Sequence, residues 1–255
     1  MVPARLGSRR FPGKVLAELS GYPVVWHALR RLAATPAVDE ALVATDSPEV
    51  LTAVTGLGGK AVLIETPCAT GSDRVAVVAR ERDCEFVINL QADQPLIDPA
   101  DIASTVELLR NDPSLDITTL AFSSRDTAAF ADPHVVKVVT DTRGRALYFS
   151  RAAIPAVPST PADPSAPADP SAGGSGWYLH HVGLYCFRRD ALLRFAELDR
   201  SPLEMRESLE QLRALEHGMA IGVATTTTAS WSIDRPEDLA RVEREFEAGG
   251  RDLVV

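Results

Sequence analysis

Residues 86–93 read FVINLQAD, a short apolar run that closes on an amide and a carboxylate. Four other runs have the same form: ALVATD (41–46), AVLIE (61–65), DITTLAF (116–122) and AIGVATTT (220–227). Apolar runs of this length with polar ends are typical of buried strands. The five segments therefore predict the strands of one buried sheet.

Segments with helical spacing separate the first strands. Val25, Leu29 and Leu32 recur at intervals of four and three, and Ser47-Pro48 is typical of an N-cap followed by the first helical turn. Strands that alternate with helices through about residue 122 predict an α/β fold, with a Rossmann-like, mostly parallel sheet and helices on both faces. Ligands of such sheets bind beyond the carboxyl ends of the strands, so polar residues there are the first candidates for a site.

The sequence beyond residue 177 predicts one more strand and three helices. The strand is YLHHVGLYCF (178–187), and the helices are DALLRFAEL (190–198), PLEMRESLEQLRALEHG (202–218) and PEDLARVEREFEAG (236–249). These elements complete a single domain that spans residues 1–255.

Residues 156–176 consist almost entirely of Pro, Ala, Ser, Asp and Gly. Such a segment has too little apolar surface to offset the entropy lost on ordering, so we expect a flexible surface loop. It lies between Arg151 and His181, where it acts either as a lid or as a tolerated insertion.

Charge and hydropathy exclude several classes of partner. Lys and Arg number 26 against 35 Asp and Glu, a net charge of −9 that disfavours nucleic acid and anionic membranes. No apolar run approaches the roughly 18 residues of a membrane span, and MVPARLGSRRFPGK lacks the apolar stretch of a signal peptide. We therefore expect a cytoplasmic protein, with Cys68, Cys84 and Cys186 reduced, buried and inert.

The N-terminal segment PARLGSRRFPGK (3–14) gathers Arg5, Arg9, Arg10 and Lys14 among small residues. Small residues let backbone N–H groups approach phosphate oxygens, which Arg and Lys side chains also bind. The segment predicts a polyphosphate site, with a solvated basic loop as the simpler alternative.

Carboxylates follow two of the predicted strands. Asp93 closes residues 86–93 and Asp46 closes residues 41–46, so both are expected at the carboxyl edge of the sheet. Asp234 is a further candidate, although its position before Pro236 also suits a helix N-cap. Two carboxylates together with phosphate and water satisfy Mg²⁺, which keeps several waters.

Other polar residues suit an organic ligand. GSDR (71–74) opens a predicted helix whose free N–H groups bind anions, with ordinary capping by Ser72 as the alternative. Arg151 and the pair His180-His181 suit a carboxylate or a polyhydroxyl ligand.

The run SPLEMRESLEQLR (201–213) carries Glu207, Glu210 and Gln211 at helical spacing. A solvated helix face is the default interpretation of this spacing. These side chains would reach a ligand only if the helix borders the pocket.

Taken together, these motifs closely resemble the 3-deoxy-manno-octulosonate (Kdo) cytidylyltransferases, also called CMP-Kdo synthetases. The matches keep the family order: PARLGSRRFPGK, VATD, GSDR, NLQADQP, VKVVTDTRGRALYFSRAAIP, HHVGLY, SPLEMRESLEQLR and IDRPEDLARV. The resemblance implies a Rossmann-like domain that binds CTP and a smaller sheet region that carries a homodimer contact. It also implies attack by the anomeric hydroxyl of Kdo on the α-phosphorus of CTP, giving pyrophosphate and CMP-Kdo for lipopolysaccharide assembly.

The resemblance also implies a role for particular residues. Triphosphate contacts fall on Arg5, Arg10 and Lys14, and Mg²⁺ ligands on Asp93 and Asp234; these five would be the catalytic groups. Contacts with cytosine or ribose fall on Ser72, Arg74 and Gln91. Contacts with Kdo fall on Arg151, His181, Tyr185, Glu210 and Gln211.

The chain departs from the family pattern in two places. The usual Q-G-D-E-P motif reads QADQP at 91–95, where Ala92 adds a methyl group and Gln94 removes a charge, so nucleotide affinity or metal geometry is expected to differ. Only Met1 and Val2 precede the PAR motif, where the family has an apolar strand. We therefore expect that central strand to be nearly absent and the coding start to lie upstream.

Three other functions compete with this interpretation. CMP transfer to another acidic sugar, such as a sialic-acid-like or amino-substituted Kdo substrate, would need the same CTP motifs. A metal-dependent glycosyltransferase is disfavoured because the sequence contains no Asp-x-Asp. A nucleotide-binding protein without catalysis fits the short first strand, but the presence of both Asp93 and Asp234 favours catalysis.

Overall fold

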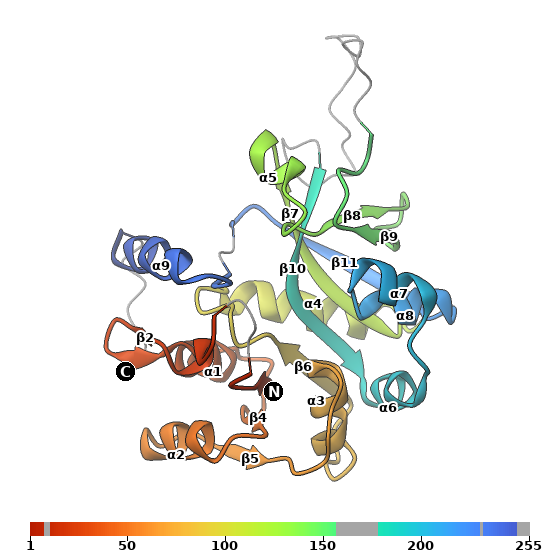
Figure 1. The fold of residues 1–255 in the computed structure, drawn as a ribbon. Helices are drawn as coiled ribbons and strands as arrows, with labels where there is room; N and C mark the ends of the chain where they lie inside the picture. The colour runs from red at the N-terminus through yellow and green to blue at the C-terminus, as the bar shows by residue number, and fades with distance from the viewer. Residues whose placement is uncertain (8–10, 157–177, 230–231, 249–255) are drawn as a thin grey trace.

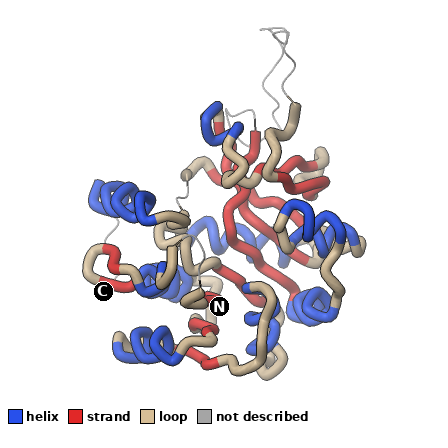
Figure 2. The backbone as a smooth tube through the Cα atoms, viewed as in Figure 1, coloured by secondary structure: helices blue, strands red, loops and turns tan. Residues whose placement is uncertain are grey.

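The computed structural model describes residues 1–7, 11–156, 178–229 and 232–248. Its strands are β1 (Val2–Ala4), β2 (Glu18–Leu19), β3 (Tyr22–Pro23), β4 (Val43–Thr45), β5 (Ala61–Leu63), β6 (Phe86–Leu90), β7 (Ile117–Ser124), β8 (Lys137–Thr140), β9 (Ala146–Ser150), β10 (Tyr178–Arg188) and β11 (Ile221–Thr226). Its helices are the 3₁₀ turn η1 (Lys14–Leu16), α1 (Val24–Ala33), α2 (Pro48–Gly56), α3 (Gly71–Ala79), α4 (Pro99–Asn111), α5 (Thr127–Ala131), α6 (Arg189–Glu197), α7 (Pro202–Glu207), α8 (Gln211–Glu216) and α9 (Pro236–Ala248). The long strands β7 and β10 cross the middle of the molecule, and helices such as α2, α6 and α9 lie toward its outside (Figures 1 and 2).

Two sheets meet at the N-terminal strand. One has the order β1-β4-β5 and is parallel, and the other has the order β11-β7-β10-β8-β9, with β6 also paired to β10. The Met1 amino group donates to Ile88 O at 2.6 Å, and Leu90 N donates to Met1 O at 3.1 Å. These two bonds join β1 to β6 and connect the sheets.

The predicted α/β fold is confirmed, and the sheet is mixed in its second half. All five apolar runs form strands, and β7 and β11 are parallel to each other. The strand β10 lies between β6 and β7 and runs antiparallel to both. Its apolar residues alternate between the two faces: Val182, Leu184 and Cys186 pack with α1 and α4, whereas Tyr185 and Phe187 pack with α3 and α6.

The expectation that the first strand would be nearly absent is wrong. Val2, Pro3 and Ala4 are buried and pair in parallel with Val43, Ala44 and Thr45 of β4. The strand is short, but the bonds of Met1 to β6 extend its pairing on the other side.

The single helix predicted over 202–218 is in fact two helices. Ser208 has a left-handed backbone (φ 54°) and ends α7, and α8 begins at Gln211. The break turns Glu210 and Gln211 away from solvent, so the predicted solvated face is also wrong: Gln211 is buried, and Glu207 and Glu210 are partly buried.

Several smaller expectations have mixed outcomes. Ser47 caps α2 as predicted, with Pro48 in the first turn. All three cysteines are free, but only Cys186 is buried, and Cys68 and Cys84 are half-buried. No helix in the described residues is long and apolar enough to cross a membrane. The expectation of a flexible loop concerns residues that, beyond Ala156, lie outside the described part of the chain.

Candidate active site

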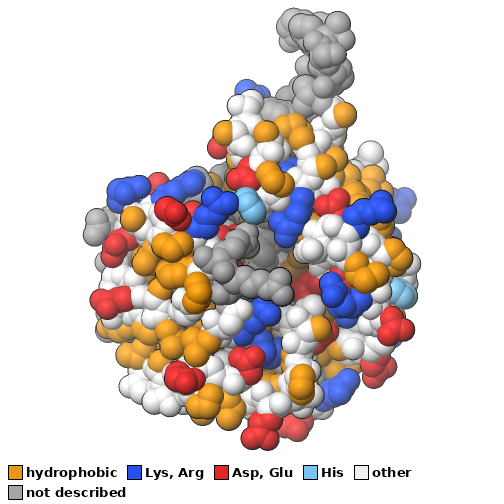
Figure 3. Space-filling model, in the orientation of Figure 1, with side chains coloured by type: hydrophobic (Ala, Val, Ile, Leu, Met, Phe, Trp, Pro, Cys, Tyr) orange, Lys and Arg blue, Asp and Glu red, His pale blue; other side chains and the backbone are white. Residues whose placement is uncertain are grey.

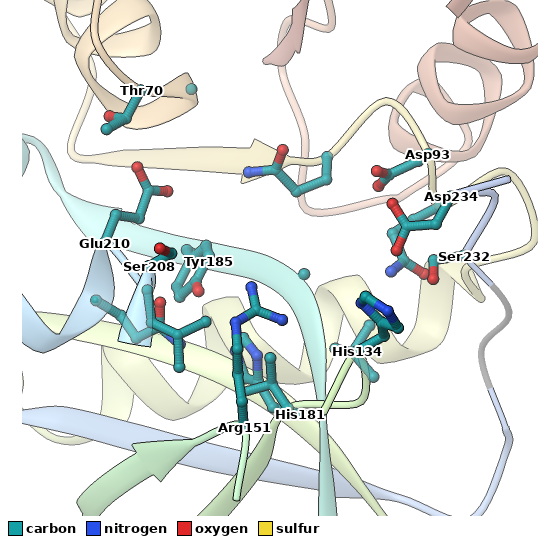
Figure 4. A pocket seen from close by; sticks show the side chains of 18 of the residues that line it. Thr70, Asp93, His134, Arg151, His181, Tyr185, Ser208, Glu210, Ser232 and Asp234 are labelled. Carbon is teal, nitrogen blue, oxygen red and sulfur yellow. The ribbon is translucent and has the colours of Figure 1, made fainter. Parts of the chain in front are cut away.

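A cavity of about 790 Å³ opens at the carboxyl ends of β1 and β6 and extends along β10 to the α7–α8 break. This is the edge where the sequence predicts a ligand. Although the chain is acidic overall, Lys and Arg side chains surround the middle of this face in the space-filling view (Figure 3). The cavity has two ends with different chemistry, and a close view shows both (Figure 4).

Asp93 and Asp234 line one end of the cavity, and both contact the buried Lys14. Lys14 Nζ lies 2.7 Å from Asp93 Oδ2 and 3.5 Å from Asp234 Oδ1. Asp93 follows β6, and Ile233 N donates to Asp93 O at 3.0 Å, which brings Asp234 beside it. The main-chain N–H groups of Asp234 and Arg235 donate to Asp238 Oδ2, at 2.9 and 2.8 Å. Asp238 therefore accepts the hydrogen bonds of the N–H groups at the start of α9, and the Asp234 carboxylate faces the cavity.

The chemistry of this end fits a hydrated divalent cation. The described residues contain no group of three or more His, Cys, Asp or Glu side chains that could enclose a metal. Two adjacent carboxylates that already share an ammonium group favour positive charge, and Mg²⁺ binds with few protein ligands and several waters. Arg5 is exposed and lines the same cavity, whereas Arg10 lies outside the described residues.

Gln91 and Arg74 border a smaller cavity of about 130 Å³, which shares Arg5, Gly71 and Gln91 with the large one. Arg74 is 4% exposed and donates from Nη2 to Asp46 Oδ2 at 2.6 Å. A Cβ on Gly71 would lie 3.2 Å from Pro3 Cγ and 3.4 Å from Gln91 Nε2, so a side chain there would crowd this side of the site. The predicted nucleotide residues Arg74 and Gln91 therefore lie together.

Ser72 lies behind the cavity wall and does not cap α3. The cap is Thr70, which forms a reciprocal capping box with Asp73. Ser72 Oγ donates to Glu210 Oε1 at 2.8 Å and accepts from Asn89 Nδ2 at 2.9 Å. Ser72 is buried, so it reaches a ligand only through Glu210.

The other end of the cavity carries Arg151, His181, Tyr185, Glu210 and Gln211 (Figure 4). Arg151 follows β9, and the two aromatic residues lie on β10, with ring centroids 5.5 Å apart. The α7–α8 break brings Glu210 and Gln211 to the same wall. Residues from three separate parts of the chain thus form one polar surface.

His181 is neutral, and its hydrogen bonds assign the tautomer. Burial and, to a smaller extent, the neighbouring His180 lower its pKa from 6.5 to about 3. Thr119 Oγ1 donates its only hydrogen to Leu184 O at 2.7 Å, so at 2.9 Å from His181 Nε2 it must accept. The proton of His181 is therefore on Nε2, and Nδ1 is an acceptor for a ligand hydroxyl.

Polar atoms at this end are buried without a protein partner. Among the described residues, Glu210 Oε2 and Gln211 Nε2 have no hydrogen-bond partner. Hydrogen bonds from Thr70 and Ser72 lower the pKa of Glu210, but burial outweighs them and raises it above its ordinary value. Burial also raises the pKa of Tyr185 well above its ordinary value. Buried polar atoms are costly to leave unpaired, so this arrangement favours a polyhydroxyl ligand.

Sequence reasoning missed several residues of the cavity. His134, Arg200, Glu204 and Ser232 also line it. Gln94 lines it as well. Ala92 packs in the apolar core, so the expectation that the Ala92 methyl group would lie next to the nucleotide is wrong. No spacing or composition signal distinguishes these residues from ordinary surface or core positions.

Comparisons with known proteins agree with this geometry. A family model described as Cytidylyltransferase matches residues 1–221. A 3-deoxy-manno-octulosonate cytidylyltransferase of Syntrophotalea carbinolica is 45% identical over 95% of this chain and 96% of its own length. One of Geobacter metallireducens is 43% identical over 95% and 94%. A solved structure of CMP:2-keto-3-deoxy-manno-octonic acid synthetase complexed with CTP matches with a TM-score of 0.84 and 37% identity over 97% of both chains.

Proposed function

This chain belongs to the cytidylyltransferase family, and we propose that it is a nucleotidyltransferase that transfers CMP from CTP to Kdo. The products are CMP-Kdo, an activated sugar for lipopolysaccharide assembly, and pyrophosphate. Relatives with this name match nearly the full chain, and the solved relative was complexed with CTP.

One observation carries this proposal: a single cavity joins a charged end and a hydrogen-bonding end. Lys14, Asp93 and Arg5 suit a triphosphate and its counter-ion, whereas Arg151 and His181 suit a sugar acid with hydroxyl groups. The reacting atoms of the two substrates would therefore meet between the two ends.

The reaction forms a bond between the anomeric oxygen of Kdo and the α-phosphorus of CTP, and it breaks the bond from that phosphorus to the bridging oxygen of pyrophosphate. The hydroxyl proton of the anomeric carbon passes to water. Arg5 and Lys14 bind the triphosphate and neutralise the charge that moves onto pyrophosphate. Arg151 holds the sugar carboxylate, and His181 Nδ1 accepts from a sugar hydroxyl. This positioning turns an encounter of two substrates into a reaction within one complex.

The residues that would hold a divalent metal are Asp93 and Asp234, and we propose Mg²⁺ as the ion. A bound metal would polarise the α-phosphate and make a contacting hydroxyl more acidic. This chemistry makes a dedicated protein base unnecessary.

Arg74 and Gln91 are proposed to bind cytosine or ribose. They line the smaller cavity next to the triphosphate residue Arg5, and Arg74 Nε has no partner in the described part of the chain. We also infer that the enzyme works in the cytoplasm, where CTP is made.

The enzyme is further proposed to be a homodimer that pairs through β9 and α7. Leu147 on β9 is 61% exposed and Met205 on α7 is 56% exposed, the two most exposed large apolar side chains in the described chain. Tyr148 OH donates to Glu207 Oε1 at 3.3 Å, so the two elements are adjacent. Sedimentation of the wild type and Leu147→Glu tests this pairing, because a buried charge would dissociate the dimer.

Pyrophosphate release from the purified enzyme with CTP and MgCl₂ tests the function. Release that depends on Kdo, and is absent without a sugar, is the expected result. Release with a sialic acid but not with Kdo would assign another acidic sugar. A folded protein that binds CTP but releases no pyrophosphate with any sugar would overturn the proposal in favour of a binding protein.

A further inference from the structure

Lys137, at the start of β8, is a completely buried lysine that the proposed chemistry does not use. Its Nζ donates to three main-chain oxygens: Asp132 O at 3.0 Å, Val135 O at 2.7 Å and Arg151 O at 2.7 Å. An ammonium group has three N–H donors and all are used, whereas a neutral amine has only two. Burial lowers the pKa of Lys137, and the three acceptors are what keep a buried ammonium tolerable.

The three carbonyl groups belong to the two segments that present polar side chains to the cavity. Asp132 and Val135 bracket Pro133 and His134, and His134 lines the cavity. Pro133 O accepts from Arg151 Nη1 at 3.1 Å. Lys137 therefore fixes both the main chain of Arg151 and the turn whose carbonyl holds its guanidinium group.

Glu207 holds Arg151 from the opposite side. Glu207 Oε2 accepts from Arg151 N at 3.0 Å, and the main-chain oxygen of Glu207 accepts from Arg151 Nε at 2.8 Å. Glu207 Oε1 accepts from Ser150 Oγ at 2.7 Å. Burial would raise the pKa of Glu207, but these hydrogen bonds outweigh burial and lower it, so the carboxylate stays ionised.

Each hydrogen bond that holds Arg151 is thus made to Lys137, to Glu207 or to the turn that Lys137 holds. Its N–H, its C=O, its Nε and one hydrogen of Nη1 are engaged. No hydrogen bond within the described chain occupies Nη2, which remains for a ligand. A flexible Arg loses side-chain freedom when it binds an anion, and one held in place beforehand loses less.

We propose that Lys137 and Glu207 are positioning residues that hold Arg151 as a preformed clamp for the carboxylate of the sugar substrate. This inference rests on the proposed function for the identity of the ligand. Neither residue needs to touch the sugar, since both act through the main chain and guanidinium group of Arg151.

Steady-state kinetics of Lys137→Met and Glu207→Gln test the clamp. Each change is expected to raise KM for Kdo by about 10- to 100-fold, as loss of a supporting contact does in other sites, and to leave KM for CTP within about twofold. In enzyme that already carries Arg151→Ala, the same two changes should raise KM for Kdo by less than about threefold, because the guanidinium group that they position is absent. Lys60→Met, an exposed lysine paired with Glu40, is the matched control.

Other outcomes would overturn the proposal. One is a rise in KM for Kdo by the same factor with and without Arg151. Another is an equal rise in KM for Kdo and KM for CTP. A third is no change in KM for Kdo. If Lys137→Met does not fold, Glu207→Gln alone carries the test, since it keeps the side-chain shape.

If the wild type does not use Kdo, the proposed function fails, but the clamp remains testable by amide hydrogen exchange. Glu207→Gln should speed exchange of the Arg151 N–H at least tenfold relative to Lys60→Met. Unchanged exchange would overturn the clamp whatever the substrate is.

Discussion

The two ends of the cavity are built in different ways. At the phosphate end, the part of the cavity proposed to bind the triphosphate, Lys14 contacts both Asp93 and Asp234, and the two carboxylate side chains are 24% and 29% exposed. At the sugar end, the part of the cavity proposed to bind Kdo, Arg151, His181 and Glu210 each rest on a second layer of polar residues. These are the buried Lys137 and the partly buried Glu207 for Arg151, the buried Thr119 for His181, and the buried Ser72 for Glu210.

This difference follows from what each end is proposed to hold. A metal ion and a triphosphate carry enough charge to be held by a few charged side chains, and water completes the coordination. A sugar is recognised by the directions of its hydroxyl groups, so its partners must be fixed before it arrives. The comparison predicts that changes at the phosphate end remove activity and spare stability, whereas changes at the sugar end affect both.

The largest effect is expected from Asp93→Asn or Asp234→Asn. Each removes a carboxylate that is proposed to bind the metal. Such a ligand contributes several kcal/mol in the transition state, so kcat should fall about 10³-fold. The melting temperature should change by no more than a few degrees, because both side chains are partly exposed. Pyrophosphate release and thermal unfolding measure the two quantities, with the exposed Asp190→Asn as control. Undiminished turnover in both variants would refute the metal assignment.

The sequence singles out Lys14, Asp93 and Asp234, which the structure brings together, and Asp93 shows the physical reason. Asp93 ends an apolar run, and a carboxylate at the end of a buried strand is conspicuous against its neighbours. The same logic predicts the strands β4 to β7 and β11. Sequence reasoning also predicts β10 as a strand over 178–187, but it does not place β10 between β6 and β7, because that pairing is non-local and an apolar strand does not specify its neighbours.

The second layer of the sugar end is much harder to predict. Lys137 begins the short strand β8, where it precedes two valines, and Thr119 is one of two adjacent threonines in the run of β7. Such residues are informative only once their burial and partners are known. The break at Ser208 is similar, since helical spacing continues through it and only the left-handed backbone reveals it.

Arg213→Met tests the stability of the sugar end. Arg213 is 2% exposed and donates to both oxygens of Glu204, each at 2.8 Å. Removing it leaves the buried Glu204 with only Arg200 as a cationic partner, so we expect a loss of about 3 kcal/mol in the free energy of unfolding. Urea unfolding measures it, and Arg194→Met, in an exposed ion pair, should cost less than about 1 kcal/mol. Equal losses of unfolding free energy in Arg213→Met and Arg194→Met would contradict the proposed difference between the two ends.

A pH effect on stability is expected from His181. Burial lowers its pKa from 6.5 to about 3, so between these values the unfolded chain binds a proton that the folded chain does not. The stability contributed by neutral His181 is therefore lost as the pH falls below 6.5, by about 2 kcal/mol at pH 5. In His181→Gln, the loss of unfolding free energy between pH 7 and pH 5 should be smaller by that amount. The same pH dependence in wild type and variant would show that His181 protonates in the fold, and the exposed His217→Gln is the control.

The smallest effect is expected from shortening the Pro/Ala/Ser-rich segment between the two sugar-end residues Arg151 and His181. Its composition offers little apolar surface to bury, so replacing residues 158–175 with a short Gly/Ser linker should change the free energy of unfolding by about 1 kcal/mol or less. KM for Kdo separates its two possible roles: an unchanged KM means a tolerated insertion, whereas a raised KM with unchanged stability means a lid. A stability loss well above 1 kcal/mol would instead show that the segment packs on the domain.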